Sequence, residues 1–132
     1  MGYGTLYGDS CGSLAVIGDL YKTEVYQLSE WINRDGIRIP QNSIDKAPSA
    51  ELRPGQKDSD SLPDYEVLDA ILNLYLDEAM CEDEIVAEGY DRETVRLAIR
   101  KTAQNEWKRL QFAPQIKVSP VSFGLDRRWP IS

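Results

Sequence analysis

The sequence predicts a mainly α protein in which three to four helices are joined by long irregular loops. Two observations carry this prediction. Apolar side chains recur at helical spacing in several segments, whereas little of the chain keeps the alternating period of a strand. Glycines and prolines interrupt the chain between these segments. The 132 residues are enough for one domain with one modest core.

The first helix is expected over about 21–33, because apolar residues recur there on one face. These residues are Val25, Leu28, Trp31 and Ile32. Asp19 is a candidate N-cap, and Gly36 follows just past the end. The next segment, 37–40, is predicted either as a short strand or as the approach to the loop that follows it.

Three more helical segments follow. The second helix is expected after Ser61 and Pro63, a suitable cap and first-turn pair. Its apolar stripe is Tyr65, Leu68, Ile71, Leu72 and Tyr75. A short helix over 81–88 ends at Gly89, and a fourth helix opens at Asp91. The apolar face of the fourth helix is Val95, Ala98, Ile99, Thr102, Trp107 and Leu110.

Together the helical segments form a helical body, expected over 19–111, and irregular segments precede, interrupt and follow it. Residues 1–18 hold five glycines, which permit close approach to phosphate but more commonly make turns. The loop 45–63 interrupts the body and carries donors suited to phosphate oxygens, although a solvated linker explains it equally well. These donors are Lys46, Ser49, Arg53 and Lys57. Residues 112–132, with three prolines, are expected as an extended arm lying over a surface.

Composition excludes several kinds of chemistry. The chain has no histidine, which removes Ser-His and Cys-His dyads, and its only cysteines, Cys11 and Cys81, are expected as free thiols. The net charge is −7, yet residues 100–132 carry +5. That basic end lacks a nucleic-acid motif, so no nucleic-acid partner is expected. Without a long apolar run or a signal sequence, the protein is expected in the cytoplasm and not in a membrane.

Four segments together resemble one family. They are Gly2-Tyr-Gly-Thr-Leu-Tyr-Gly-Asp9, residues 46–69, Asn105-Glu-Trp-Lys-Arg-Leu-Gln-Phe-Ala-Pro114 and residues 118–131. In this order they resemble the C-terminal portion of the synthetase domain of NAD synthetases. Leu6 and Ser13 stand where ammonia-only members often have a lysine and an aspartate, which points to the glutamine-dependent branch.

The resemblance implies a fold and an activity. The fold would be the C-terminal portion of an α/β adenine-nucleotide α-hydrolase-like (Rossmann-like) domain whose parallel sheet is largely missing. The family adenylates the nicotinate carboxylate of deamido-NAD with ATP and Mg²⁺, and ammonia then displaces AMP. By resemblance, Lys22 and Ser49 would bind ATP. Tyr3, Trp107 and Lys108 would bind deamido-NAD, and Asp9 would lie near the metal.

Each role has a plain structural rival. Asp9 can stabilise a turn, and Ser49 can bond its own backbone. Lys22 can be solvated, although a lysine in a first helical turn opposes the helix dipole and a phosphate would explain it better. Lys108 can complement a helix C-terminus, and Trp107 is more often a core residue.

The resemblance also implies what the parent protein holds elsewhere. The family's Ser-Gly-Gly-x-Asp-Ser loop does not occur in the 132 residues, nor does a glutaminase domain with its Glu, Lys and Cys. We therefore expect a fragment of a glutamine-dependent enzyme that is inactive alone and forms a homo-oligomer in its parent. The alternative is a non-catalytic fragment or paralogue that acts in oligomerisation.

Overall fold

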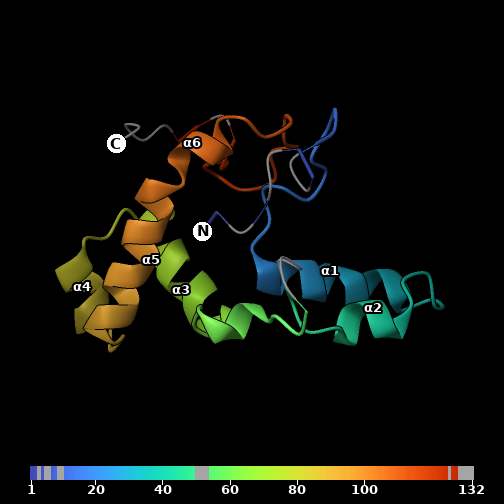
Figure 1. Cartoon of the computed structure of the whole chain (residues 1–132), viewed down its shortest axis with the longest axis horizontal. Coiled ribbons are helices and arrows are strands. Elements are labelled where there is room, and N and C mark those ends of the chain that lie inside the picture. Colours follow the sequence, from blue (N-terminus) through green and yellow to red (C-terminus); the bar gives the residue numbers. More distant parts are fainter. Residues whose placement is uncertain (3, 5–6, 9–10, 50–53, 125, 128–132) are drawn as a thin grey trace. The chain divides into compact units, whose positions relative to one another are not determined.

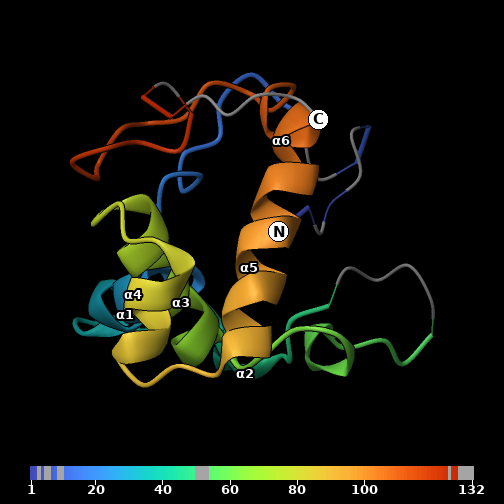
Figure 2. The ribbon, with the colours of Figure 1, turned by 90° about the vertical axis from the view of Figure 1, so that its left-hand side faces the viewer.

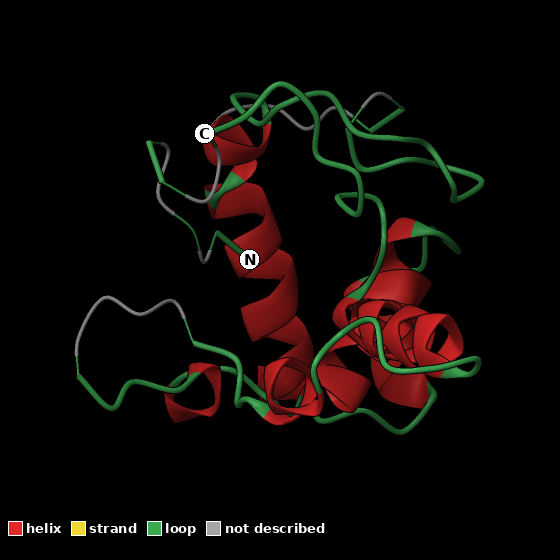
Figure 3. Ribbon diagram, turned by 90° about the vertical axis from the view of Figure 1, so that its right-hand side faces the viewer, coloured by secondary structure: helices red, strands yellow, loops and turns green. Residues whose placement is uncertain are grey.

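A computed structural model describes residues 1–132 except 3, 5–6, 9–10, 50–53, 125 and 128–132. Within those residues the mainly α prediction is confirmed, since there is no strand and only an isolated bridge joins Ala15 to Gln115 (Figure 3). The elements (Figure 1) are α1 (Lys22–Asn33), α2 (Gln41–Asp45), the 3₁₀ helix η1 (Asp58–Asp60), α3 (Tyr65–Leu76), α4 (Glu82–Ala87), α5 (Arg92–Gln104) and α6 (Glu106–Arg109).

The chain forms two compact units. The first unit comprises Met1–Asp19 and Ala70–Ser132, and the second unit is Leu20–Asp69. Helix α3 therefore starts in the second unit and ends in the first. No helix of the described chain is both long and apolar enough to cross a bilayer.

Helix α1 of the second unit occupies the expected residues, but its N-cap is not Asp19. Tyr21 is the N-cap, and its backbone N–H donates to a carboxylate oxygen of Glu24 at 2.7 Å. None of the residues of α1 is buried, and Trp31 keeps 58% of its surface exposed. Helix α1 therefore carries the predicted apolar stripe, but the stripe contributes no buried residue to a core.

The segment after α1 is an approach to the loop and not a strand. The side-chain oxygen of Asn33 accepts from the N–H groups of Arg38 and Ile39, both at 2.9 Å, and its amide nitrogen donates to the Ile39 carbonyl. One asparagine thus satisfies backbone groups that a strand would need to pair. Helix α2 then follows Pro40 as a short element that no sequence pattern predicted.

The described part of the loop 46–63 is packed within the second unit and not fully solvated. The Asp58 N–H donates to the Pro48 carbonyl at 2.9 Å, and both Asp58 and Leu62 are buried. Helix α3 begins only at Tyr65, so Ser61 and Pro63 precede it and the expected cap and first-turn pair was wrong.

Among the described residues, one side-chain hydrogen bond serves the buried carboxylate of Asp58. The Tyr65 hydroxyl donates to Asp58 Oδ2 at 2.6 Å, while Oδ1 is buried without a partner. Burial and this bond to Asp58 raise the pKa of Tyr65. We expect Tyr65→Phe to lower the free energy of unfolding by about 1–3 kcal/mol, because it leaves a buried carboxylate unsatisfied. Urea denaturation measures this, and Tyr7→Phe, at an exposed position, is the control. Equal losses for both variants would contradict the assignment.

The first unit holds a small apolar core. Helices α4 and α5 lie side by side (Figure 2), and Arg92 and Arg96 on α5 both reach Glu82 on α4, at 2.8 and 2.9 Å. Asp91 caps α5 as expected, its carboxylate accepting from the Thr94 N–H at 2.9 Å. The buried apolar residues of this unit are Ile71, Leu72, Leu76, Ile85, Val95 and Ala98.

The predicted fourth helix is in fact two helices, because Asn105 interrupts it. The Asn105 side chain donates to the Lys101 carbonyl at 2.8 Å, whereas its backbone N–H bonds to Ala103. The side chain thus takes the carbonyl that the helical N–H would have used. Beyond this break Trp107 and Leu110 are exposed, so their expected place on the buried face was wrong.

The C-terminal arm is fastened to the glycine-rich segment by Asp19. Its carboxylate is 1% exposed and accepts from the N–H groups of Val118, Ser119 and Phe123 and from the Ser119 hydroxyl, each at 2.8 Å. Burial alone would raise the pKa of Asp19, but these hydrogen bonds outweigh it and lower the pKa. Ser122 of the arm is buried, whereas Ile116 and Val118 keep 43% and 60% of their surface exposed, so the arm lies along the surface of the first unit and is anchored there.

Candidate functional site

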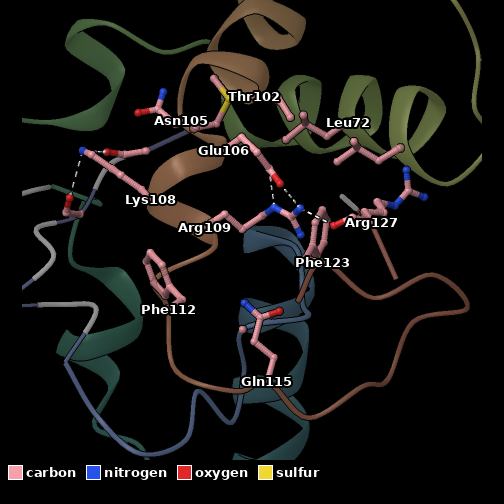
Figure 4. A pocket seen from close by; sticks show the side chains of 15 residues that line it. Leu72, Thr102, Asn105, Glu106, Lys108, Arg109, Phe112, Gln115, Phe123 and Arg127 are labelled. Carbon is pink, nitrogen blue, oxygen red and sulfur yellow. Dashed lines mark hydrogen bonds and ion pairs between the residues drawn. The ribbon is translucent and has the colours of Figure 1, made fainter. Parts of the chain in front are cut away.

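The first unit contains a pocket of about 340 Å³ (Figure 4). Helices α5 and α6, the end of α3, the glycine-rich segment and the arm all contribute to it. Arg109 and Gln115 face each other across it, with Phe112 and Phe123 on the flanks. Leu72 and Leu76 add further apolar surface. The pocket therefore combines apolar walls with a few polar groups, as ligand or docking pockets do.

One ion pair lies in the lining of this pocket, and a second reaches the lining through Arg127. Glu106, 1% exposed, receives a forked contact from Arg109, in which the Nε–Oε2 distance is 2.7 Å. Arg109 also donates to the Arg127 carbonyl, and the Arg127 guanidinium contacts Asp77 at 3.1 Å. Each buried charge thus has a counter-charge, and the network joins α6, the arm and the end of α3.

Lys108 lies at the edge of the same pocket. Its Nζ donates to the carbonyl oxygens of Gly2 at 2.8 Å and of Gly4 at 3.3 Å, and stands 5.7 Å from the centroid of the Trp107 ring. An ammonium has three donors, so one donor remains for a further acceptor. Lys108 therefore ties α6 to the glycine-rich segment and is not merely a charge at a helix end.

The two residues expected to bind ATP belong to the second unit. Lys22 is the first residue of α1, and its Nζ lies 5.3 Å from the Tyr26 ring centroid. Ser49 is half-buried in the loop before η1. Neither residue is buried, so each is accessible to a ligand.

Four residues singled out from the sequence lie outside the described residues: Tyr3, Leu6, Asp9 and Arg53. Over the part that is described, no three His, Cys, Asp or Glu side chains gather closely enough to hold a metal ion. The metal role of Asp9 consequently stays a prediction. Cys11 and Cys81 are both exposed and neither is in a disulfide, in agreement with the expected thiols.

Most residues that shape the pocket were not predicted from the sequence. Glu106 and Arg109 have the i, i+3 spacing of a helical ion pair, a signal that was available. Gln115 and Arg127 gave no signal, because their partners are distant in the chain. Several basic side chains of the C-terminal end, which carries +5, are also paired with carboxylates. Lys117 pairs with Asp126, Arg109 with Glu106 and Arg127 with Asp77.

The sequence of this chain matches known proteins over its whole length. It is 52% identical to a glutamine-dependent NAD(+) synthetase of Xanthomonas campestris and 49% identical to one of Xylella fastidiosa, each match covering 100% of this chain. It covers only 24% and 25% of those relatives, about a quarter of their length.

A solved structure supports the same relationship. The glutamine-dependent NAD+ synthetase of Acinetobacter baumannii, in complex with ADP, matches 98% of this chain and is 39% identical to it, with a TM-score of 0.53. This chain covers 22% of that structure. The family described as NAD synthase matches residues 1–112. The resemblance seen in the four sequence segments is thereby confirmed, and the chain belongs to the NAD synthase family.

Proposed function

We propose that this chain is part of a glutamine-dependent NAD synthetase, which amidates deamido-NAD to NAD with ATP and with ammonia from glutamine. The observation that carries the proposal is that the whole chain matches relatives that bear this name, over about a quarter of their length. Residues 1–132 would be the C-terminal portion of the adenine-nucleotide α-hydrolase-like synthetase domain, working in the cytoplasm. The glutaminase domain and the Ser-Gly-Gly-x-Asp-Ser loop would lie in the rest of the parent.

The residues have chemistry that suits these substrates. Lys22 and Ser49 would hold ATP, the ammonium neutralising phosphate charge as the adenylate forms. Lys108 would offer its third donor to deamido-NAD, with Trp107 and Tyr3 beside the same ligand. Asp9 would hold Mg²⁺, which supplies further charge neutralisation when bound.

The chain alone is expected to be inactive, because the phosphate-binding loop of the family lies outside it. Titration calorimetry with ATP and Mg²⁺ tests the ATP assignment. We expect Lys22→Ala to raise the Kd about tenfold, through loss of one charge-assisted contact, and Ser49→Ala to raise it several-fold. Lys117→Ala, at an exposed lysine paired with Asp126, should leave the Kd unchanged.

Two results would contradict the proposal. Equal ATP affinity in all four proteins would remove the roles of Lys22 and Ser49. Turnover of deamido-NAD, ATP and ammonia to NAD by the isolated chain would contradict the view that this chain holds only part of the site.

One observation favours a second role in association. Leu28 and Trp31 of α1 are exposed, and Ile37 just beyond keeps 83% of its surface exposed. Clustered exposed apolar residues are typical of protein interfaces, and these three are close together in the sequence. A homo-oligomer of the parent protein would cover these residues. Analytical ultracentrifugation would then show a lower sedimenting mass for Trp31→Glu than for wild type.

A further inference from the structure

The first turn of α1 carries Lys22, and its backbone needs acceptors from outside the helix. The first four N–H groups of an α-helix have no partner within it. The N-cap residue Tyr21 makes no side-chain hydrogen bond to the turn, although its own N–H donates to Glu24. The carboxylate of Asp19, the local candidate for a cap, accepts from the arm instead. The other open N–H groups of the turn must therefore find acceptors elsewhere.

Asp69 of α3 provides such an acceptor. Its Oδ2 accepts from the Thr23 N–H at 2.8 Å, a contact between residues 46 positions apart in the sequence. Both residues belong to the second unit, and Asp69 keeps only 8% of its surface exposed. Burial raises the pKa of Asp69, and hydrogen bonds from Thr23 and from the Lys22 N–H oppose this rise. Asp69 thus acts as a cap for α1 that is supplied by another helix.

Apolar packing contributes little to the place of α1, because none of the residues of α1 is buried. The Lys22 Nζ lies 5.3 Å from the centroid of the Tyr26 ring, one turn further along the helix, which is a cation–π distance. Burial and the charge of Asp58 raise the pKa of Tyr26, so this ring faces the polar interior of the unit. Polar contacts thus set the position of Lys22, since Asp69 holds the backbone of its turn and Tyr26 lies beside its ammonium.

The charge of Asp69 also suits a lysine at this place. A lysine in a first helical turn opposes the helix dipole, whereas a carboxylate at the same end of the helix is favourable. Asp69 therefore offsets part of the cost of Lys22. An ammonium whose place is set before a ligand arrives loses less freedom on binding, which favours affinity.

We propose that Asp69 is a positioning residue for the ATP site, which fixes the first turn of α1 so that the Lys22 ammonium meets the phosphates. The inference rests on the proposed function, because it takes Lys22 as an ATP ligand. Asp69 itself does not touch ATP. Its effect on ATP affinity must then pass through Lys22, which separates this role from a general contribution to stability.

Titration calorimetry with ATP and Mg²⁺ on the 132-residue chain tests the role. We expect Asp69→Ala to raise the Kd about fivefold, because the first turn loses its acceptor. Asp69→Asn keeps a side-chain carbonyl for the Thr23 N–H and should stay within about twofold of wild type. Glu66→Ala removes an exposed carboxylate from the same helix and the same unit, and its Kd should equal that of wild type.

The double variant Lys22→Ala/Asp69→Ala shows whether the effect passes through Lys22. Its Kd should equal that of Lys22→Ala alone, whereas independent effects would multiply. Hydrogen exchange at the Thr23 amide reads the contact without any ligand. The protection factor of this amide should fall about tenfold in Asp69→Ala and persist in Asp69→Asn and in Lys22→Ala.

Unchanged ATP affinity in Asp69→Ala, beside weakened binding in Lys22→Ala, would overturn this inference and leave the proposed function standing. A double variant weaker than Lys22→Ala by the full fivefold would overturn it too, as would an unchanged protection factor of Thr23 in Asp69→Ala. Equal affinity in wild type and Lys22→Ala would instead remove the ATP role of Lys22, and this inference would fail with it.

Discussion

Replacing Glu106 with alanine is expected to lower the free energy of unfolding by about 3–5 kcal/mol. The carboxylate is fully buried and is the counter-charge of Arg109, whose side chain is 19% exposed. Without it, a largely buried guanidinium keeps its desolvation cost and loses its partner. The contact of Arg109 with the Arg127 carbonyl would weaken as well, so the arm should loosen together with α6. Urea denaturation followed by circular dichroism measures the loss.

The chain offers a matched control for this change. Glu93 and Arg96 have the same i, i+3 spacing on α5, but they are exposed and 3.6 Å apart. Glu93→Ala should cost no more than the roughly 0–1 kcal/mol of an exposed pair. Glu106→Gln should fall between the two, because it keeps hydrogen bonding without the charge. Similar losses for Glu106→Ala and Glu93→Ala would show that the buried network does not hold α6.

The substitution Asp19→Asn is expected to cost about 2–4 kcal/mol, because an amide cannot replace this carboxylate. Oδ2 accepts three hydrogen bonds and Oδ1 accepts one, all from donors on the arm. In either orientation, an asparagine would turn its own NH₂ group toward N–H donors. The arm should detach first, and hydrogen exchange at Val118, Ser119 and Phe123 would report this.

Acid should have a related effect on the wild-type protein. The folded-state pKa of Asp19 is lowered, so its contribution to stability is complete above the unfolded-state pKa of about 4 and is lost as the pH falls through the lower folded-state value. We expect the protection factors of the arm amides to fall below about pH 4, and Asp19→Asn should abolish this dependence. The exposed Asp83 provides the control, and Asp83→Asn should leave the pH profile of the arm unchanged. A profile that is the same in Asp19→Asn and wild type would refute the assignment.

The helices were predictable where local signals were complete. The periodic stripes of α1, α3 and α5 and the cap at Asp91 depend on residues a few positions apart, and the structure confirms them. The α5–α6 break was missed because Asn105 is compatible with a helix, and only its competing side-chain bond ends the helix. Helix α2 is a five-residue element too short for a periodic signal.

The site was predictable in part. The resemblance singled out Lys108, which lines the pocket, and Trp107, whose ring lies beside the Lys108 ammonium but is not part of the lining. The sequence could not reveal that Lys108 donates to carbonyls more than a hundred residues away. Asp19 was misread as a helix cap, because an aspartate just before a helix has that local meaning. Its true partners lie about a hundred residues further along, where no spacing rule applies.

The division into units has a consequence for the order of folding. The second unit is one continuous stretch, so it can form as soon as that stretch exists. The first unit is built from Met1–Asp19 and Ala70–Ser132, and its joint at Asp19 must close a loop of about a hundred residues. Closing so long a loop is slow and entropically costly. During synthesis, the glycine-rich segment is made about a hundred residues before the arm that completes its unit, so the first unit is expected to finish folding after the second unit.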